Sequence, residues 1–178
     1  MRFPSAMNFI AVAFLLAGGS CFAQEKKADA APVKEGVLKP ADLENKFLPS
    51  KVFFRGQVAS VQVRNSGGVR YADGFLVLAT LVDNSGYASG IKEKYQAYLI
   101  TEVPLQIGGQ TLKPGAYGVG FVENKFVVMD IAANDVFSVD SAKDQNLKPA
   151  MPLQVVSGEM GHYRLYKGRD YVEFSRVK

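Results

Sequence analysis

Apolar and polar residues alternate from Tyr95 to Ile107, and this alternation is the clearest pattern in the chain. Odd positions carry Tyr95, Ala97, Leu99, Val103, Leu105 and Ile107, and even positions carry Gln96, Glu102, Pro104 and Gln106. This is the period of a strand with one buried face. Gly108-Gly109 follows, and two glycines supply the positive φ angles of a two-residue hairpin turn. The pattern predicts a β-hairpin in which Leu105 faces Leu112.

A second hairpin is predicted over residues 116–131. Its two strands, 116–122 and 126–131, flank Glu123-Asn124, and asparagine tolerates the left-handed conformation that a tight turn needs. A two-residue turn places Phe121 opposite Phe126 and so fixes the register of the whole hairpin.

One side of the strand 116–122 is nearly bare, because Gly118 and Gly120 alternate with bulky residues. A strand interior gives up about 0.5–1 kcal/mol per glycine relative to alanine, so we expect something to need the space. Either aromatic side chains from a neighbouring element fill this glycine trough, or it holds a ligand. The apolar residues that the assumed pairing adds to the same face are Val127, Met129 and Ile131.

A third hairpin is predicted at the C-terminal end of the chain. A Gly168-Arg169 turn aligns complementary charges and like apolar residues at the same time, and glycine in the first central position suits a type II′ turn. The predicted pairs are Lys167 with Asp170, Tyr166 with Tyr171, Leu165 with Val172, Arg164 with Glu173, and Tyr163 with Phe174.

Weaker patterns occupy the region before these hairpins. The segment 75–82 is apolar at almost every position, as expected for a central strand covered on both faces. In 52–64 the apolar positions change phase, so a bulge or a break is needed near Arg55-Gly56. Residues 65–68 carry the composition of a turn, and 40–48 suits either one short helix or an extended lead-in.

These patterns predict an all-β, mainly antiparallel domain over residues 49–178. About nine strand patterns and no long helix favour a single-domain β-sandwich or a small barrel with at most one or two short helices. Residues 24–48 are expected to be a flexible spacer and lead-in to this domain.

The N-terminal residues predict the location of the protein. Residues 1–23 have a positive charge at Arg2, an apolar run and small residues leading to Ala23, which is the order of a secretory signal peptide. We therefore expect the protein to be exported, either periplasmic or secreted, with no transmembrane segment in the mature chain. Lipid anchoring at Cys21 is the alternative, although Gly18 stands where lipoprotein signals usually have leucine.

The net charge and the titratable side chains add few candidate functional residues. The formal net charge is +4, but lysine and arginine are scattered along the sequence, so we expect ordinary solvated surface and no nucleic-acid partner. His162 is the only histidine, and we expect it to be solvated in the last hairpin. The carboxylate pairs Asp130 with Asp135, and Asp140 with Asp144, lack the spacing of a known calcium loop. Glu159 and His162 are too few to hold zinc, so we expect no metal, no cofactor and no catalytic set.

The run IGGQTLKPGAYGV, residues 107–119, resembles a hairpin pattern of small secreted bacterial proteins. Those families are largely domains of unknown function, so the resemblance implies a secreted β-rich fold and no active site. We favour a non-catalytic module that binds a partner protein, a glycan or a small apolar ligand. The alternative is a carbohydrate-active hydrolase whose carboxylates are brought together by the fold.

Overall fold

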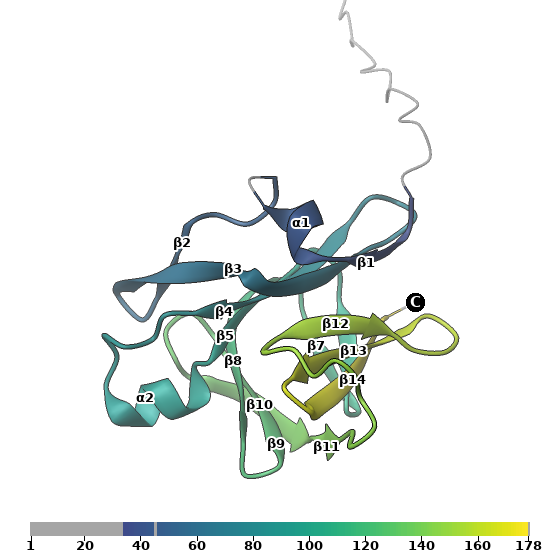
Figure 1. Ribbon diagram of the computed structural model, residues 1–178. Helices are drawn as coiled ribbons and strands as arrows, with labels where there is room; N and C mark the ends of the chain where they lie inside the picture. The colour runs from purple at the N-terminus through teal and green to yellow at the C-terminus, as the bar shows by residue number, and fades with distance from the viewer. Residues whose placement is uncertain (1–33, 45, 178) are drawn as a thin grey trace, which may run out of the picture. The chain divides into compact units, whose positions relative to one another are not determined.

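Two antiparallel sheets make up the described part of the chain (Figure 1). The computed structural model describes residues 34–44 and 46–177. The predicted leader, with Cys21, and the first part of the predicted spacer lie outside the described residues. The prediction of a mainly antiparallel β fold is confirmed, and the two sheets do not close into a barrel.

The first sheet has eight strands. Seven follow one another in the order β1, β3, β4, β5, β8, β9, β10, and β2 pairs with β3. Their bounds are β1 Gly36–Leu38, β2 Lys51–Phe54, β3 Gln57–Arg70, β4 Leu76–Val82, β5 Ala97–Thr101, β8 Gly115–Val122, β9 Lys125–Met129 and β10 Asp135–Asp140.

The second sheet has six strands, in the order β12, β13, β14, β6, β7, with β11 paired to β14. Their bounds are β6 Leu105–Ile107, β7 Gln110–Leu112, β11 Ala142–Lys143, β12 Gln154–Ser157, β13 His162–Lys167 and β14 Asp170–Arg176. Two short helices, α1 Pro40–Leu43 and α2 Ser89–Lys94, complete the fold. Neither of these helices is long and apolar enough to cross a membrane, and the described residues contain no other helix.

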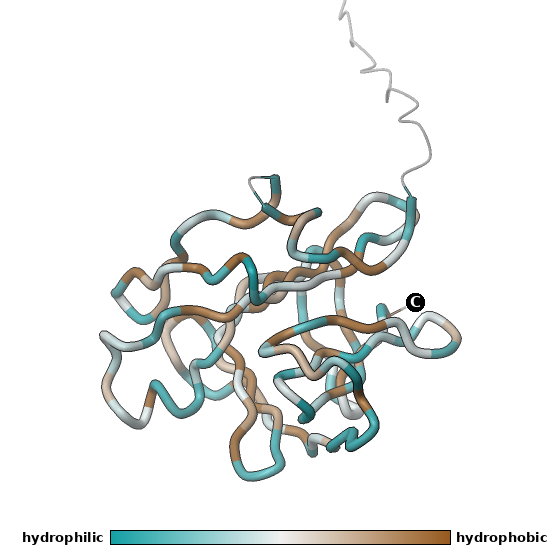
Figure 2. The backbone as a smooth tube through the Cα atoms, in the orientation of Figure 1, coloured by the Kyte–Doolittle hydropathy of each residue, from teal (hydrophilic) through white to brown (hydrophobic). Residues whose placement is uncertain are grey.

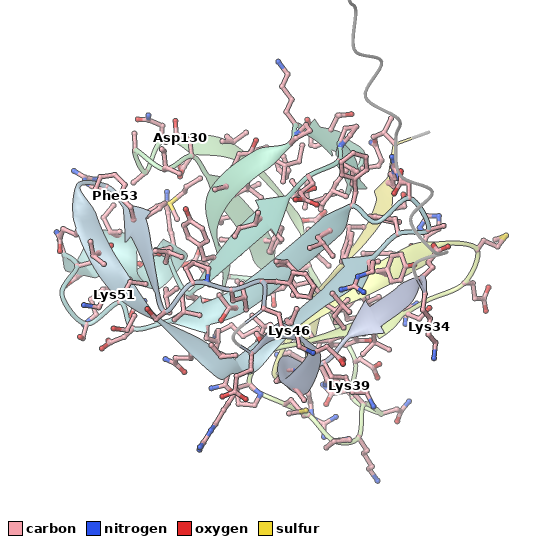
Figure 3. The ribbon with its side chains drawn as sticks, turned by 90° about the horizontal axis from the view of Figure 1, so that it is seen from above. Lys34, Lys39, Lys46, Lys51, Phe53 and Asp130 are labelled. Carbon is pink, nitrogen blue, oxygen red and sulfur yellow. The ribbon has the colours of Figure 1, made fainter. Side chains whose placement is uncertain are left out.

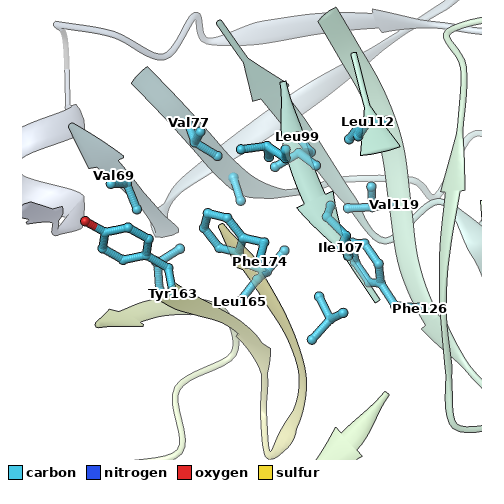
Figure 4. Close-up of a cluster of buried hydrophobic side chains, with 14 of the residues drawn as sticks. Val69, Val77, Leu99, Ile107, Leu112, Val119, Phe126, Tyr163, Leu165 and Phe174 are labelled. Carbon is cyan, nitrogen blue, oxygen red and sulfur yellow. The ribbon is translucent and has the colours of Figure 1, made fainter. Parts of the chain in front are cut away.

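The main core lies between the two sheets (Figure 4). From the first sheet it takes the inward residues of β3, β4, β5, β8, β9 and β10, and from the second sheet those of β6, β7, β12, β13 and β14. In Figure 2 the hydrophobic colours run along these strands and the hydrophilic ones gather on the connections. The alternation in the sequence therefore places one side chain in two into this core.

The outer face of the first sheet is covered as well. At one end, α1 contributes Leu43, which packs with Leu38, Leu48 and Leu78. At the other end, the β2–β3 hairpin and the α2 region cover the sheet with an aromatic cluster, which we call the outer cluster. Its buried members are Val52, Phe54, Ala59, Val82, Tyr87, Tyr95, Tyr98, Val127 and Met129. The prediction that 75–82 is a strand covered on both faces is confirmed, because Val77 faces the main core and Leu78 faces α1.

All three predicted hairpin turns are confirmed. Gly108 and Gly109 have φ angles of +52° and +82°, Glu123 and Asn124 have +48° and +62°, and Gly168 has +61°. The registers agree with the predicted pairs, including Leu105 with Leu112, Phe121 with Phe126, and all five pairs of the last hairpin.

Two sequence-based predictions about strands and turns need correction. The stretch 95–107 is not one strand, because the chain crosses from the first sheet to the second between β5 and β6; Tyr95 precedes β5 and packs in the outer cluster. Residues 65–68 are not a turn, since β3 continues through them after a register shift between Gln62 and Ser66. The break near Arg55-Gly56 is confirmed, and it is the turn between β2 and β3.

The domain also begins earlier than predicted. β1 and α1 lie within the segment that we assigned to the spacer and lead-in, and β1 pairs with β3 from Gly36 opposite Arg70 to Leu38 opposite Gly68. The short helix that Pro40 favoured is present, because proline fits the first turn and the Asp42 carboxylate accepts a hydrogen bond from the Lys39 backbone N–H at 2.9 Å.

Candidate functional site

The predicted glycine trough is filled by protein. A Cβ added to Gly118 would lie 2.6 Å from Cζ of Phe54 and 2.9 Å from Cδ2 of Tyr95. These two rings stack on each other with centroids 3.9 Å apart. The face of β8 beside Gly118 is therefore occupied by aromatic side chains from neighbouring elements, which is one of the two interpretations that the sequence left open.

Gly120 is covered in a different way. A Cβ there would collide with the backbone carbonyl of Lys94, at the end of α2. The Gln96 side chain lies over the same position and bonds the Phe121 backbone twice, donating to its carbonyl and accepting from its N–H, both at 3.0 Å. Glycine at this position lets the end of α2 approach the sheet closely.

The other trough residues divide between core and surface. Val127 and Met129 are buried in the outer cluster, opposite Gly120 and Gly118 as predicted. Ile131 was expected on this face beside Ala116, but it lies beyond the end of β9 and is 47% exposed. Protein atoms therefore occupy the space directly over Gly118 and Gly120.

The four carboxylates of the predicted pairs each bond to a different group of the protein. Asp130 accepts a hydrogen bond from the Asn134 side-chain amide at 3.0 Å and from the backbone N–H groups of Asn134 and Ala132, both at 2.9 Å, and these bonds lower the pKa of its carboxyl. Asp135 forms an ion pair with Lys94 at 2.7 Å.

The carboxylates of the second predicted pair, Asp140 and Asp144, also have different partners. Asp140 pairs with Lys125 at 2.5 Å, and Asp144 accepts a hydrogen bond from the Tyr166 hydroxyl at 3.1 Å. Within residues 34–44 and 46–177, no three His, Cys, Asp or Glu side chains are grouped closely enough to hold a metal ion.

His162 has polar neighbours on the outer face of the second sheet. Its Nδ1 lies 3.1 Å from one carboxylate oxygen of Glu173, and Nε of Arg164 lies 3.3 Å from the other. Ser175 is the cross-strand partner of His162. Alternation along β13 and β14 places all four side chains on one face, because the intervening residues Tyr163, Leu165, Val172 and Phe174 point into the core.

A groove runs beside these residues because the edge of β14 is only partly paired. β11 pairs with β14 at Asp170 and Tyr171, and β6 pairs with it from Phe174 to Arg176. Between them, β14 has a partner only on the β13 side. A hollow of about 430 Å³ occupies this gap, and its polar lining is contributed by Gln106, Asp140, His162, Tyr171, Glu173 and Ser175.

A second hollow of about 670 Å³ adjoins the first at His162 and Ser175. It is lined by Glu35, Tyr71, Met160 and Arg176, among others. The Arg176 guanidinium bonds Asp73 at 2.6 Å and lies 5.3 Å from the centre of the Tyr71 ring. We call the two hollows together the β14 groove.

Tyr71 is the most constrained polar group of this groove. It is 6% exposed, and its hydroxyl is buried without a hydrogen-bond partner in the described part of the chain. Burial raises the pKa of Tyr71 to about 12. An unpaired buried hydroxyl has a cost unless another group satisfies it, so a ligand in the second hollow that reached this hydroxyl would gain a hydrogen bond.

The sequence pointed to few of these groove residues. His162 was named, and Arg164 and Glu173 were predicted as a pair, but Glu35, Tyr71 and Arg176 are far apart in the sequence and only the fold brings them together. The groove lies where β14 lacks a strand partner. That gap depends on contacts between distant parts of the chain, and no local pattern of residues in the sequence indicates it.

Comparison of the chain with protein families, with curated proteins and with solved structures finds no match. The resemblance of residues 107–119 to secreted bacterial hairpins therefore stays a prediction.

Proposed function

We propose that the chain is an exported, non-catalytic module that binds a glycan in the β14 groove. The observation that carries this proposal is the groove itself: two adjoining surface hollows along one strand, whose lining combines apolar surface with several side chains that donate or accept hydrogen bonds.

The chemistry of the lining favours a hydroxyl-rich ligand. Gln106 offers both an amide donor and an acceptor, Ser175 a hydroxyl, Glu173 a carboxylate and His162 an imidazole. The ring of Tyr171 adds an apolar surface with a polar tip. A small apolar ligand would displace water from the Ser175 hydroxyl and the Gln106 amide nitrogen without replacing its hydrogen bonds, which costs free energy.

The experiment is a binding titration of the purified protein against a panel of neutral and acidic oligosaccharides, followed by paired variants. Gln106→Ala with Ser175→Ala removes two groove side chains. Loss of two hydrogen bonds is expected to weaken binding about tenfold. The matched control is Gln57→Ala with Ser60→Ala, the same two residue types exposed on the other sheet, which should bind as the unmodified protein does. The proposal fails if no glycan binds, or if the control weakens binding equally.

One observation favours the hydrolase as a second candidate. Asp140 and Glu173 line the same hollow, and glycosidases use two carboxyl groups that flank the scissile bond. However, each is paired with a cation, Lys125 for Asp140 and Arg164 for Glu173, whereas the acid of such an enzyme needs surroundings that keep it protonated. Release of reducing ends that is abolished both by Asp140→Asn and by Glu173→Gln would establish the hydrolase.

Export is tested separately by the intact mass of the protein recovered from cells. A chain that begins at Gln24 supports a cleaved signal peptide, and one that begins with a lipid-modified Cys21 supports the anchored alternative. A full-length chain retained in the cytoplasm would contradict the proposal.

A further inference from the structure

The basic charge of the chain is concentrated in one part of it. Residues 34–70 contain seven Lys or Arg and three Asp or Glu, a net charge of +4, whereas residues 71–178 contain eleven and twelve, a net charge of −1. The positive residues appear scattered along the sequence, but 34–70 forms the contiguous elements β1, α1, β2 and β3.

These elements form one side of the domain. Figure 3 looks onto this side and shows Lys34, Lys39, Lys46 and Lys51 spread across it, with Phe53 near Lys51. All four lysines are exposed, as is Arg55 in the turn between β2 and β3. We call this surface the basic face.

The cations of the basic face are not neutralised by neighbours. In the described residues, every ion pair that involves Lys or Arg takes its cation from the region after residue 70. No Lys or Arg between 34 and 70 lies within ion-pair distance of a described carboxylate. The carboxylates in the same region are Glu35, Asp42 and Glu44. Because residues 34–70 carry a net charge of +4 and none of their cations is paired with a described carboxylate, whereas five cations after residue 70 are paired and that region has a net charge of −1, the basic face projects a positive field.

An exposed apolar pair accompanies the charge. Phe53 and Val58 are cross-strand partners in the β2–β3 hairpin and are 53% and 61% exposed. They lie on the same outward side of the hairpin as Lys51, because Val52 and Phe54 between them are buried. The hairpin therefore presents an aromatic ring and a branched side chain, flanked by Lys51 and Arg55.

We propose that the basic face docks on the surface of a bilayer that contains anionic phospholipids. Lysine and arginine near such a surface each contribute about 1 kcal/mol of attraction, and apolar side chains flanked by cations insert into the boundary between headgroups and acyl chains. Phe53 and Val58 favour a bilayer over an acidic polysaccharide, because a soluble polymer offers no apolar layer to receive them. None of the residues that line the first hollow of the β14 groove belongs to 34–70, so docking would leave that hollow open to a glycan. The second hollow includes Glu35, which is next to Lys34 in the chain.

The test measures binding of the purified protein to vesicles of phosphatidylcholine alone and of phosphatidylcholine with phosphatidylglycerol. We expect binding only to the anionic vesicles, and weaker binding as salt is raised. Lys39→Gln with Lys46→Gln removes two charges and should lower the partition coefficient about 25-fold, at about fivefold per charge. Phe53→Ser should lower it several-fold with no change of charge.

The matched control is Lys113→Gln with Lys148→Gln, two exposed lysines outside the basic face, which should bind nearly as well as the unmodified protein. All variants share one N-terminus, so an attached lipid would affect them equally, and thermal melts show that each is folded. Equal losses in the control and basic-face variants would overturn the proposal. Binding to an acidic polysaccharide without binding to anionic vesicles would overturn it as well.

Discussion

The outer faces of the two sheets differ in what covers them. On the first sheet, α1, α2 and the β2–β3 hairpin bury the outer face, and the rings of Phe54 and Tyr95 stack 3.9 Å apart over Gly118. On the second sheet, the corresponding face carries His162, Arg164 and Glu173, all partly exposed.

The comparison shows that glycines in a strand can mark close packing, and that an open groove can form beside a strand with full side chains. In β8, glycine is present because aromatic rings and the end of α2 come too close for a side chain. In β14, full side chains are present and the groove arises from missing strand partners instead.

Replacing Gly118 with alanine tests how tightly the outer cluster is packed. The new Cβ would meet Phe54 and Tyr95 at distances that require one of them to move, and overpacking of this kind costs about 1–3 kcal/mol. The measurement is the free energy of unfolding from urea denaturation. Gly90→Ala in α2 is the matched control: its Cβ would have no neighbour within 4 Å, and alanine favours the helix by about 0.5–1 kcal/mol. Equal effects at both positions would contradict the close packing.

Alkaline pH should lower the stability of the folded chain through the tyrosines of the outer cluster. Burial raises the pKa values of Tyr87, Tyr95 and Tyr98 above 10, their ordinary value. Because the folded chain holds these protons more tightly than the unfolded chain does, the stabilisation is complete below pH 10 and is lost as the pH rises toward the folded-state values. Urea midpoints measured from pH 8 to pH 11 should fall in the upper part of this range, and Tyr95→Phe should reduce the fall. An unchanged slope in that variant would exclude Tyr95 as a source.

Two tyrosines of the outer cluster should respond differently to loss of the hydroxyl. The Tyr87 hydroxyl donates a hydrogen bond to the Phe54 carbonyl at 3.0 Å, whereas the buried Tyr95 hydroxyl has no partner in the described structure. Tyr87→Phe should cost about 0.5–1.5 kcal/mol, and Tyr95→Phe at neutral pH should cost nothing or stabilise slightly. Thermal and urea unfolding of the two variants provide the comparison, and a larger loss for Tyr95→Phe would mean that a bound water or another group satisfies its hydroxyl.

The smallest effect is expected on the open face. Arg164 and Glu173 are 3.3 Å apart, and their side chains are 38% and 45% exposed. A pair that solvent reaches this freely should contribute about 0.2–1 kcal/mol. A double-mutant cycle with Arg164→Gln and Glu173→Gln measures the coupling directly. A coupling well above this range would mean that the face is covered in solution.

The hairpins were predictable because their determinants are local. Gly108-Gly109, Glu123-Asn124 and Gly168 each specify a turn geometry, and the residues on either side then fall into register by alternation. The assignment of strands to sheets was not predictable in this way. Tyr95 and Leu99 have the same parity in the sequence, yet they lie on opposite faces of the first sheet, because β5 begins only at Ala97.

The candidate site was less predictable than the fold. The bare face of β8 was visible in the sequence, but whether protein or ligand fills it depends on Phe54 and Lys94, which come from other elements. The β14 groove depends on which strands pair with β14 and where they stop. These are contacts between distant parts of the chain, and the alternation of residue types does not encode them.

The order of the strands along the chain determines which parts of the domain can fold first. From β3 to β10, the strands of the first sheet pair mostly with neighbours in sequence, so this sheet is built largely from local contacts. The second sheet joins β6, from the middle of the chain, to β14, from its end, with Ile107 opposite Phe174. Contacts of such long sequence separation form slowly. A chain synthesised from its N-terminus can therefore form most of its first sheet before β14 has been made. The inner face of that sheet stays uncovered until the last strand is added, so the final residues of the chain set the time at which the core closes.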